Sequence, residues 1–506
     1  MSKQAPAHQP GTAAQGVAYL SASHAALVIF GFAVHAVASR RLGPTDYGRF
    51  VVALSTGTWL KLITLSILIP GLCKIVSEDH RRLSAALAVG RRWQLTSSAV
   101  LCLAFIAASP LTARFLGDGA LAVLIAVAGV EVFLYSVVAL RSYLMMALRR
   151  YTNAAMTLGT FAVVRAGGAG TLVLLGLGTV GAMAGLTAGP LAAGIVAVAL
   201  MWRINSRTPA EPYPAMASRA LSWTLMALPA DIGMATLMSV DIWIVKRCVP
   251  DLAAAGLYGA AYAVSRLPDM AVQGLVFAVF ARVSGALAER DGRLARSVST
   301  EAMRYLLIVL TPICVLAAGS AKEIMKLLFS APYGDAAGLL TTLVAAVSCA
   351  AALKVMLSLL AAADRPGKRS LLVLGLLPVG VGLCLWLTQR MGPGGAATAA
   401  LITMATGMAI GLALVYRYVG AFPPPLAALR CGLAGGAVLG LGLLWRVGGL
   451  MLLPKLASLG LLYVGLLFLL GELGVQDVRS VLRAVSRRAG DETGAGVDTP
   501  PPPGGE

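Results

Sequence analysis

Charged residues are scarce in this sequence of 506 residues. Asp, Glu, Lys and Arg together make up 12% of the chain, while hydrophobic residues make up 58%. An average soluble domain contains about 25% charged residues. With a mean hydropathy of +0.82, this composition excludes a water-soluble globular protein and indicates a membrane protein.

Cysteine and histidine are also rare and scattered. The seven cysteines form no CxxC pair and have no histidine cluster near them, so the sequence indicates neither a disulfide framework nor a metal site, and we expect no cofactor. No polar stretch is long enough to form a soluble domain. The connections expected outside the membrane are short and contain no histidine, which argues against an enzyme such as a membrane-embedded polysaccharide polymerase or ligase.

Long apolar runs follow one another from about Gly16 almost to Gly474. A helix that crosses a bilayer needs about 20 apolar residues, and the sequence predicts fourteen such helices in an all-α polytopic membrane protein. Their expected ranges are 16–38, 50–73, 94–113, 119–140, 153–175, 179–202, 219–245, 255–280, 302–319, 338–361, 370–389, 394–416, 426–445 and 452–471.

The net charge of +19 is distributed unevenly over these connections. If the N-terminus is cytoplasmic, 25 of the 41 Lys and Arg residues lie in cytoplasmic segments and 11 in external ones. This asymmetry is the positive-inside pattern, and it predicts a multi-pass protein of a bacterial-type plasma (inner) membrane with both termini in the cytoplasm. The remaining charge is expected to attract anionic lipid headgroups, and we expect no nucleic-acid partner.

The sequence contains an internal repeat. The segment DYGRFVVAL from Asp46 matches LYGAAYAV from Leu257, and LGTVGAMAGLTAG from Leu177 matches MGPGGAATAALIT from Met391. The offsets are 211 and 214 residues, so each half holds six of the expected helices, and the even number makes the repeat parallel. We therefore predict two six-helix lobes around a central cavity, an arrangement common in secondary transporters.

The repeat and the composition divide the chain into seven segments. The linker between the lobes is polar and contains three prolines, and the end of the chain is too polar to bury a core. The segments are a cytoplasmic N-tail (1–15), an N-lobe (16–202), a cytoplasmic linker (203–218), a C-lobe (219–419), two appended helices (420–474), an interfacial amphipathic helix (475–489) and a disordered tail (490–506).

Four segments resemble the polysaccharide-transporter branch of the MOP exporter superfamily. They are DIWIV from Asp241, AAGLYGAAYAVSRLPDM at 254–270, FSAPYGDAAGLL at 329–340 and LLAAADRPGKRS at 359–370. This branch contains the Wzx-type oligosaccharide-lipid flippases and is related to lipid II flippases and MATE exporters. The resemblance covers about residues 16–420.

The resemblance implies an alternating-access flippase that moves a polyprenyl-diphosphate-linked oligosaccharide from the cytoplasmic to the outer leaflet for surface or exopolysaccharide biosynthesis. The sugar would cross between the lobes, and the lipid tail would stay in the bilayer. Partners would be this lipid-linked oligosaccharide, membrane lipids and other polysaccharide-assembly proteins. The driving force, whether H⁺ or Na⁺ coupling or the membrane potential, is left open, as is a scaffold that keeps the fold but does not transport.

Nine ionisable residues are candidates for positions at bilayer depth. At bilayer depth such a residue costs about 2.5–3.5 kcal/mol unless it faces protein, water or a partner, so each is a functional candidate. Four cations are candidates for binding the diphosphate or sugar, four acids are candidates for ion coupling or structural pairing, and Arg141 is a candidate for reaching the cytoplasmic interface. The cations are Arg266, Lys61, Lys354 and Arg165, and the acids are Asp231, Asp269, Asp241 and Glu131. Five cations among nine residues argue against a MATE-like exporter of cationic drugs.

The segment YAVSRLPDM at 262–270 places Arg266, Pro268 and Asp269 in one expected helix. Pro268 cannot donate a hydrogen bond to the preceding turn, so the helix should break there, which is tolerable only beside protein or a wet cavity. We expect Arg266 to face the inter-lobe cavity and an anionic substrate, as an arginine at the matching place does in the lipid II flippases that this stretch resembles. Because Arg266 and Asp269 share a helix face, they could instead only neutralise each other.

Three further candidates have alternative roles. Lys61 lies on the repeat counterpart of the helix that carries Arg266, so it could flank the same cavity or pair with Glu131 or Asp231. Asp231 follows Pro229 and is the candidate for proton or ion coupling, whereas Asp241, ten residues further on, lies on a different face. The family resemblance allows a structural role for Asp241 at least as well as a role in transport.

Overall fold

The computed structural model describes residues 10–205, 216–251 and 253–474, and all regular elements within these ranges are helical. The predicted interfacial helix at 475–489 and the tail at 490–506 lie outside the described residues. The first half of the chain contains α1 (Pro10–Leu65), α2 (Ile69–Glu78), α3 (Leu83–Val89), α4 (Leu95–Ala107), α5 (Ser109–Phe115), α6 (Leu121–Ala147), α7 (Tyr151–Leu174) and α8 (Gly178–Asn205).

The second half contains as many α-helices as the first before the two appended ones. Its elements are α9 (Met216–Leu237), α10 (Val240–Cys248), α11 (Ala254–Ser265), α12 (Leu267–Ala288), α13 (Gly292–Gly319), α14 (Ala321–Leu328), η3 (Ala331–Ala336), α15 (Ala337–Ala362) and α16 (Pro366–Val419). Two further helices, α17 (Pro425–Leu444) and α18 (Leu452–Leu469), follow and are joined by η4 (Gly449–Met451).

Ten helices of the described chain are long and apolar enough to span a membrane, or eleven if one bent pair is counted. Two of these spans are far longer than one crossing needs: Ala25–Leu65 has 41 residues and Gly367–Val419 has 53. Each contains a glycine with non-helical dihedral angles, Gly43 (φ 72°) and Gly392 (φ 61°). Each of the fourteen predicted ranges overlaps a helix. The predicted count of fourteen membrane-spanning helices is not confirmed.

Several predicted boundaries differ from the structure. α1 begins at Pro10, so residues 10–15 of the predicted N-tail are helical. The predicted linker 203–218 is helical at both ends, where α8 and α9 continue into it, and residues 206–215 lie outside the described chain. The predicted helix 94–113 is bent by 50° between α4 and α5. Pro110, just after the bend, is a sequence signal for such a break, and the prediction of one straight helix did not use it.

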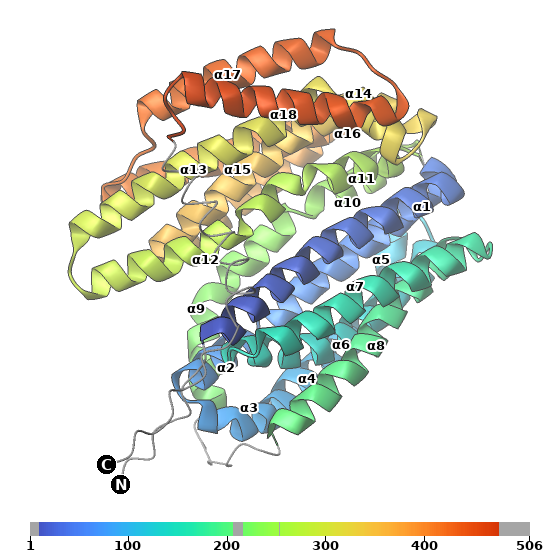
Figure 1. Cartoon of the computed structure of the whole chain (residues 1–506). Helices are drawn as coiled ribbons and strands as arrows, with labels where there is room; N and C mark the ends of the chain where they lie inside the picture. The colour runs from blue at the N-terminus through green and yellow to red at the C-terminus, as the bar shows by residue number, and fades with distance from the viewer. Residues whose placement is uncertain (1–9, 206–215, 252, 475–506) are drawn as a thin grey trace, which may run out of the picture.

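The helices form two groups, which we call the N-lobe (α1–α8) and the C-lobe (α9–α16). In the N-lobe α7 packs on α1 and α8, and in the C-lobe α15 packs on α12 and α16. Figure 1 shows the two groups side by side, with α17 and α18 along the outer side of the C-lobe, where they contact α13. Gly178 and Gly392, which the repeat pairs, both have a positive φ, of 59° and 61°.

The lobes meet chiefly along α1, which packs against α9, α10 and α11, and where α2 and α3 contact α9. The contact of α1 with α11 is made by backbone. A Cβ built on Gly256 would lie 1.9 Å from the carbonyl oxygen of Pro44, and one on Gly48 would lie 2.8 Å from the Gly256 nitrogen. Only glycine permits helices to approach this closely, so these two residues fix the spacing of the lobes here.

Candidate functional site

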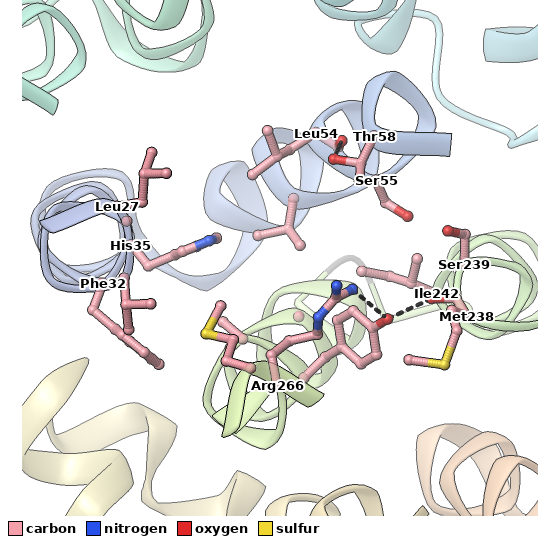
Figure 2. Close-up of a pocket in the computed structure, with 17 residues that line it drawn as sticks. Leu27, Phe32, His35, Leu54, Ser55, Thr58, Met238, Ser239, Ile242 and Arg266 are labelled. Carbon is pink, nitrogen blue, oxygen red and sulfur yellow. Dashed lines mark hydrogen bonds between the residues drawn. The ribbon is translucent and has the colours of Figure 1, made fainter. Parts of the chain in front are cut away.

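A cavity of about 250 Å³ lies between the lobes, and we call it the inter-lobe cavity. Both halves of α1 form one wall, and the residues around the α9–α10 and α11–α12 breaks form the other (Figure 2). Its lining is mainly apolar, with Leu27, Phe32, Leu54, Met238 and Ile242 among the contributors. The polar groups in the lining are those of His35, Ser55, Thr58, Ser239, Tyr262 and Arg266.

Arg266 lies at the wall of this cavity, at the break between α11 and α12. The predicted break is present: α11 ends at Ser265, and Pro268 occupies the first turn of α12. The Arg266 guanidinium donates a hydrogen bond of 3.1 Å to the Tyr262 hydroxyl and lies 5.6 Å from the centre of that ring. Tyr262 in turn donates to the Met238 carbonyl (Figure 2). Tyr262 thus holds the Arg266 guanidinium in the cavity wall through its hydroxyl and its ring.

Asp269 joins Arg266 to Lys354, and we call these three residues the Asp269 trio. The Lys354 Nζ lies 2.5 Å from Asp269 Oδ1, whereas the nearest Arg266 nitrogen lies 3.5 Å from Oδ2. The Asp269 side chain is 5% exposed, and that of Arg266 is 32% exposed. The predicted Arg266–Asp269 pair is therefore present, but Lys354 is the closer partner. Two cations share one acid, so the trio has one surplus positive charge when all three groups are ionised.

The N-lobe contains a second trio with the same charges, formed by Lys61, Glu131 and Arg165, which we call the Glu131 trio. Lys61 Nζ lies 2.9 Å from Glu131 Oε1, and Arg165 Nε lies 3.7 Å from the same oxygen. Of the two acids predicted as partners of Lys61, the structure brings Glu131 to it. The residues that line the inter-lobe cavity include neither Lys61 nor Arg165, and they do not include Lys354. The structure therefore does not place these three predicted cations beside Arg266 in the cavity lining.

The predicted acids on α9 and α10 lie apart, as their spacing indicated. Asp231 forms an ion pair with Arg369 at the start of α16. Asp241 is buried and accepts hydrogen bonds of 2.7 Å from the Tyr258 hydroxyl and 2.8 Å from the Ile242 backbone N–H. Its contacts are those of a structural acid that holds α10 to α11.

Histidine and arginine candidates outside the trios also have local partners. His35 Nδ1 lies 2.9 Å from the hydroxyl of Tyr47, which is the repeat counterpart of Tyr258 at the offset of 211. His35 also lines the inter-lobe cavity. Arg141 donates to the Val137 carbonyl of its own helix.

A third acid lies between two cations, and these three residues come from both lobes. Asp118, in the connection between α5 and α6, lies 2.8 Å from Arg49 Nε and 2.9 Å from Lys246 Nζ. Burial raises the pKa of Asp118, but its hydrogen bonds with Arg49 and Lys246 outweigh burial and hold the pKa below its ordinary value. We call this cluster the Asp118 latch, because it links the N-lobe to α10 of the C-lobe.

Sequence reasoning missed the latch. The DYGRFVVAL segment that contains Arg49 was used only to find the repeat, and Asp118 stands in a short Gly-Asp-Gly connection. Aromatic rings close the same end of the lobe interface: the Tyr47 ring centre lies 6.1 Å from that of Phe329 and 5.8 Å from that of Tyr333. Latch and rings together join the lobes beside the Gly43 turn.

Comparisons with known proteins agree with this architecture. The sequence matches the family model described as polysaccharide biosynthesis protein over residues 37–337, more than half of the chain. A search of the curated proteins finds no match. Among solved structures, the lipid II flippase MurJ in an inward closed conformation aligns with a TM-score of 0.69 at 13% identity, over 88% of this chain and 97% of that one.

Two other solved structures show the same fold. An inward-facing multidrug resistance MATE family transporter of the MOP superfamily aligns with a TM-score of 0.66 at 14% identity, over 78% of this chain and 94% of that one. A MOP superfamily transporter from Pyrococcus furiosus, described by the reverse polarity of its binding pocket, gives 0.59 at 14% identity, over 81% and 96%. At these identities the likeness concerns the fold. The chain belongs to the polysaccharide biosynthesis protein family, and its fold is that of the MOP superfamily transporters.

Proposed function

We propose that this membrane protein is a flippase that moves a polyprenyl-diphosphate-linked oligosaccharide from the cytoplasmic to the outer leaflet by alternating access. The observation that carries the proposal is the position of Arg266, a partly exposed cation in the wall of the inter-lobe cavity. The family match to polysaccharide biosynthesis supports a glycan-related substrate. The fold shared with MurJ and MATE transporters supports a transport mechanism.

Arg266 suits a diphosphate for two reasons. A guanidinium matches two phosphate oxygens at once and is effectively never deprotonated. Asp269 does not cancel its charge, because Lys354 already lies 2.5 Å from that carboxylate. The surplus positive charge also disfavours a cationic drug, the substrate expected of a MATE-like exporter.

The size of the inter-lobe cavity indicates which part of the substrate it holds. At about 250 Å³ it is smaller than the roughly 300–1,000 Å³ of sites that enclose a drug-sized ligand. The diphosphate fits this volume, whereas a whole oligosaccharide requires the lobes to move apart. The polyprenyl tail is too apolar to enter beside Arg266 and would stay in the surrounding lipid.

The Asp118 latch supplies the closed end that alternating access requires. With both termini in the cytoplasm, the connections that contain Arg49, Asp118 and Lys246 lie on the external side. The structure would then be closed outward, and opening would require that the latch breaks. A coupling role for Asp231 stays a prediction. In the structure this carboxylate forms an ion pair with Arg369.

The proposed function is tested by deleting the gene and measuring the diphosphate-linked lipids by mass spectrometry, together with an assay of the leaflet that they occupy. We expect oligosaccharide-lipid to accumulate in the cytoplasmic leaflet. Loss of polymer with a normally translocated precursor would overturn the proposal and indicate a polymerase or ligase instead.

The site is tested in the deletion strain with Arg266→Ala. Replacement should abolish complementation at normal membrane abundance, because the cavity loses its partly exposed cation. Arg282→Ala is the matched control, since Arg282 lies on the same α12 helix, is exposed and does not line the cavity. Full complementation by Arg266→Ala would assign Arg266 to structural pairing with Asp269.

A further inference from the structure

A second pocket, of about 420 Å³, lies where α1, α14 and the α17–α18 connection meet. Figure 1 shows α14 between α18 and the bend of α1. Arg40 contributes from α1, and Val447, Gly448 and Gly449 contribute from the connection. Helix α14 contributes Lys322, Glu323, Lys326 and Leu327. We call this site the basic pocket.

Two of the three cations of the basic pocket are held by neighbouring groups. Lys322 and Lys326 are exposed, lie on one face of α14 at the i, i+4 spacing, and form no ion pair within the described residues. The stem of Lys326 packs on Gly334, where an added Cβ would lie 2.8 Å from its Cε. Arg40 donates a hydrogen bond of 2.5 Å to the Leu327 carbonyl, which fixes its guanidinium at the rim.

The acid in the lining does not neutralise these cations. Glu323 lies 3.7 Å from Lys455, whose side chain is fully buried. A buried ammonium requires a counter-charge, and Lys455 also donates to the Gly319 carbonyl. Glu323 is therefore the counter-charge of Lys455. Arg40, Lys322 and Lys326 then give the pocket three positive charges without an acidic partner among the lining residues.

The side of the membrane makes this accumulation unusual. External connections are depleted of Lys and Arg, and the topology proposed above leaves 11 such residues outside. Four of them, Arg40, Lys322, Lys326 and Lys455, gather at or behind this one pocket. Concentration of the few external cations at one place, against the topological trend, indicates a ligand with negative charge.

Apolar side chains beside the pocket identify the kind of anion. Leu444 is 82% exposed, Leu450 is 76% exposed and Met451 is 66% exposed, and all three flank the glycines of the α17–α18 connection. Trp445 stands next to them, a residue type enriched at the bilayer surface. A soluble anion would not use these apolar groups, whereas a lipid with a phosphate headgroup and acyl chains contacts both surfaces.

We propose that the basic pocket binds the headgroup phosphate of an anionic phospholipid of the outer leaflet. Lys322, Lys326 and Arg40 bind the phosphate, and Leu450 and Met451 contact the first part of the acyl chains. This site is separate from the inter-lobe cavity and does not depend on the flippase activity. Its test therefore measures lipid binding and not transport.

The test is native mass spectrometry of the full chain in detergent, titrated with phosphatidylglycerol or with phosphatidylcholine. We expect phosphatidylglycerol to be retained in preference. The double substitution Lys322→Gln/Lys326→Gln should weaken that retention about tenfold or more, since each basic residue near a charged lipid surface contributes about 1 kcal/mol. The matched control is Arg114→Gln/Arg390→Gln, which removes two exposed external cations away from the pocket. Equal retention of both lipids, or an equal loss in both double variants, would overturn the proposal.

Two further measurements complete the test. A thermal unfolding curve of each double variant shows that it is folded, and exposed lysines can be replaced with little effect on stability. Inorganic phosphate is then added in excess to the phosphatidylglycerol complex. We expect the lipid to stay bound because the apolar contacts remain. Release of the lipid by this excess of inorganic phosphate would show that the pocket binds a soluble anion and would also overturn the proposal.

Discussion

The two trios have the same charges but different surroundings. In the Glu131 trio, the Lys61 side chain is 16% exposed and that of Arg165 is 18% exposed, whereas in the Asp269 trio Lys354 is 25% exposed and Arg266 is 32% exposed. The helix containing Lys61 runs unbroken to Leu65, while the helix containing Arg266 is interrupted at that residue. The comparison teaches that charge composition alone does not make a binding site: the break at Pro268 brings one cation of one trio to the inter-lobe cavity.

The largest expected effect is on stability and separates the two acids. Glu131→Gln should lower the free energy of unfolding by about 3 kcal/mol, because two mostly buried cations then lose their shared counter-charge. Asp269→Asn should cost about half as much, since its two cations are more exposed and partly hydrated. Thermal unfolding of both purified variants measures this difference. An equal or larger loss for Asp269→Asn would contradict the proposed contrast between the trios.

The Asp118 latch extends the comparison to an acid that lies between the lobes. Asp118→Asn should leave Arg49 facing Lys246 and separate the lobes at this end, so labelling of the partly buried Cys248 by an impermeant maleimide should rise about tenfold. The other six cysteines are replaced by alanine for this assay. Asp46→Asn is the matched control, because Asp46 pairs with Arg49 inside α1 and does not bridge the lobes. Equal labelling of the two variants would show that the Asp118 latch does not hold the lobes together at this end.

A smaller effect tests the helix break itself. Pro268→Ala restores a backbone donor to the Val264 carbonyl, so α11 and α12 should join and turn Arg266 from the cavity. We expect transport to fall about tenfold, while stability changes by no more than about 1 kcal/mol. Pro312→Ala, at a proline inside α13 that does not line the cavity, is the control. Wild-type transport by Pro268→Ala would show that the break does not position Arg266.

The second cation of each trio should have a weaker and unequal influence on transport. Lys354→Met leaves Asp269 with Arg266 as its partner in the trio, so Arg266 should move toward the carboxylate and transport should fall several-fold. Lys61→Met removes a cation that does not line the cavity, and transport should stay within about twofold of wild type. The measurement is the initial transport rate of each variant relative to wild type at equal membrane abundance. Equal losses would place Lys61 in the substrate path, as the sequence analysis also allowed.

The smallest expected effect is that of pH on the latch. The pKa of Asp118 is held below its ordinary value of 3.8, so its contribution to the closed state is complete above that value and is lost as the pH falls through the lowered pKa. Cys248 labelling, expressed relative to Asp118→Asn at the same pH, should therefore stay flat between about pH 5 and 8. A rise in this relative labelling between about pH 5 and 8 would show that another titratable group holds this end closed.

Local sequence signals predicted the helices and part of the site. Every predicted range overlaps a helix, Pro268 marked the break at Arg266, and spacing separated Asp231 from Asp241. Ion pairs between distant residues could not be predicted in the same way. Asp269 and Lys354 are 85 positions apart, and Asp118 and Lys246 are 128 apart. Such pairs depend on how the helices pack, and no periodicity in one segment encodes a partner in another.

The glycine contact between α1 and α11 has a consequence for how fast the lobes can separate. At Gly48 and Gly256 the two helices touch through bare main chain. Parting such smooth surfaces forfeits little dispersion energy per residue and requires no rotamer change. Resistance to opening then resides in the aromatic rings and in the charged contacts of the latch, and water can replace the charged contacts one at a time. A methyl group added at Gly256 would act as a wedge and hold this end of the molecule ajar.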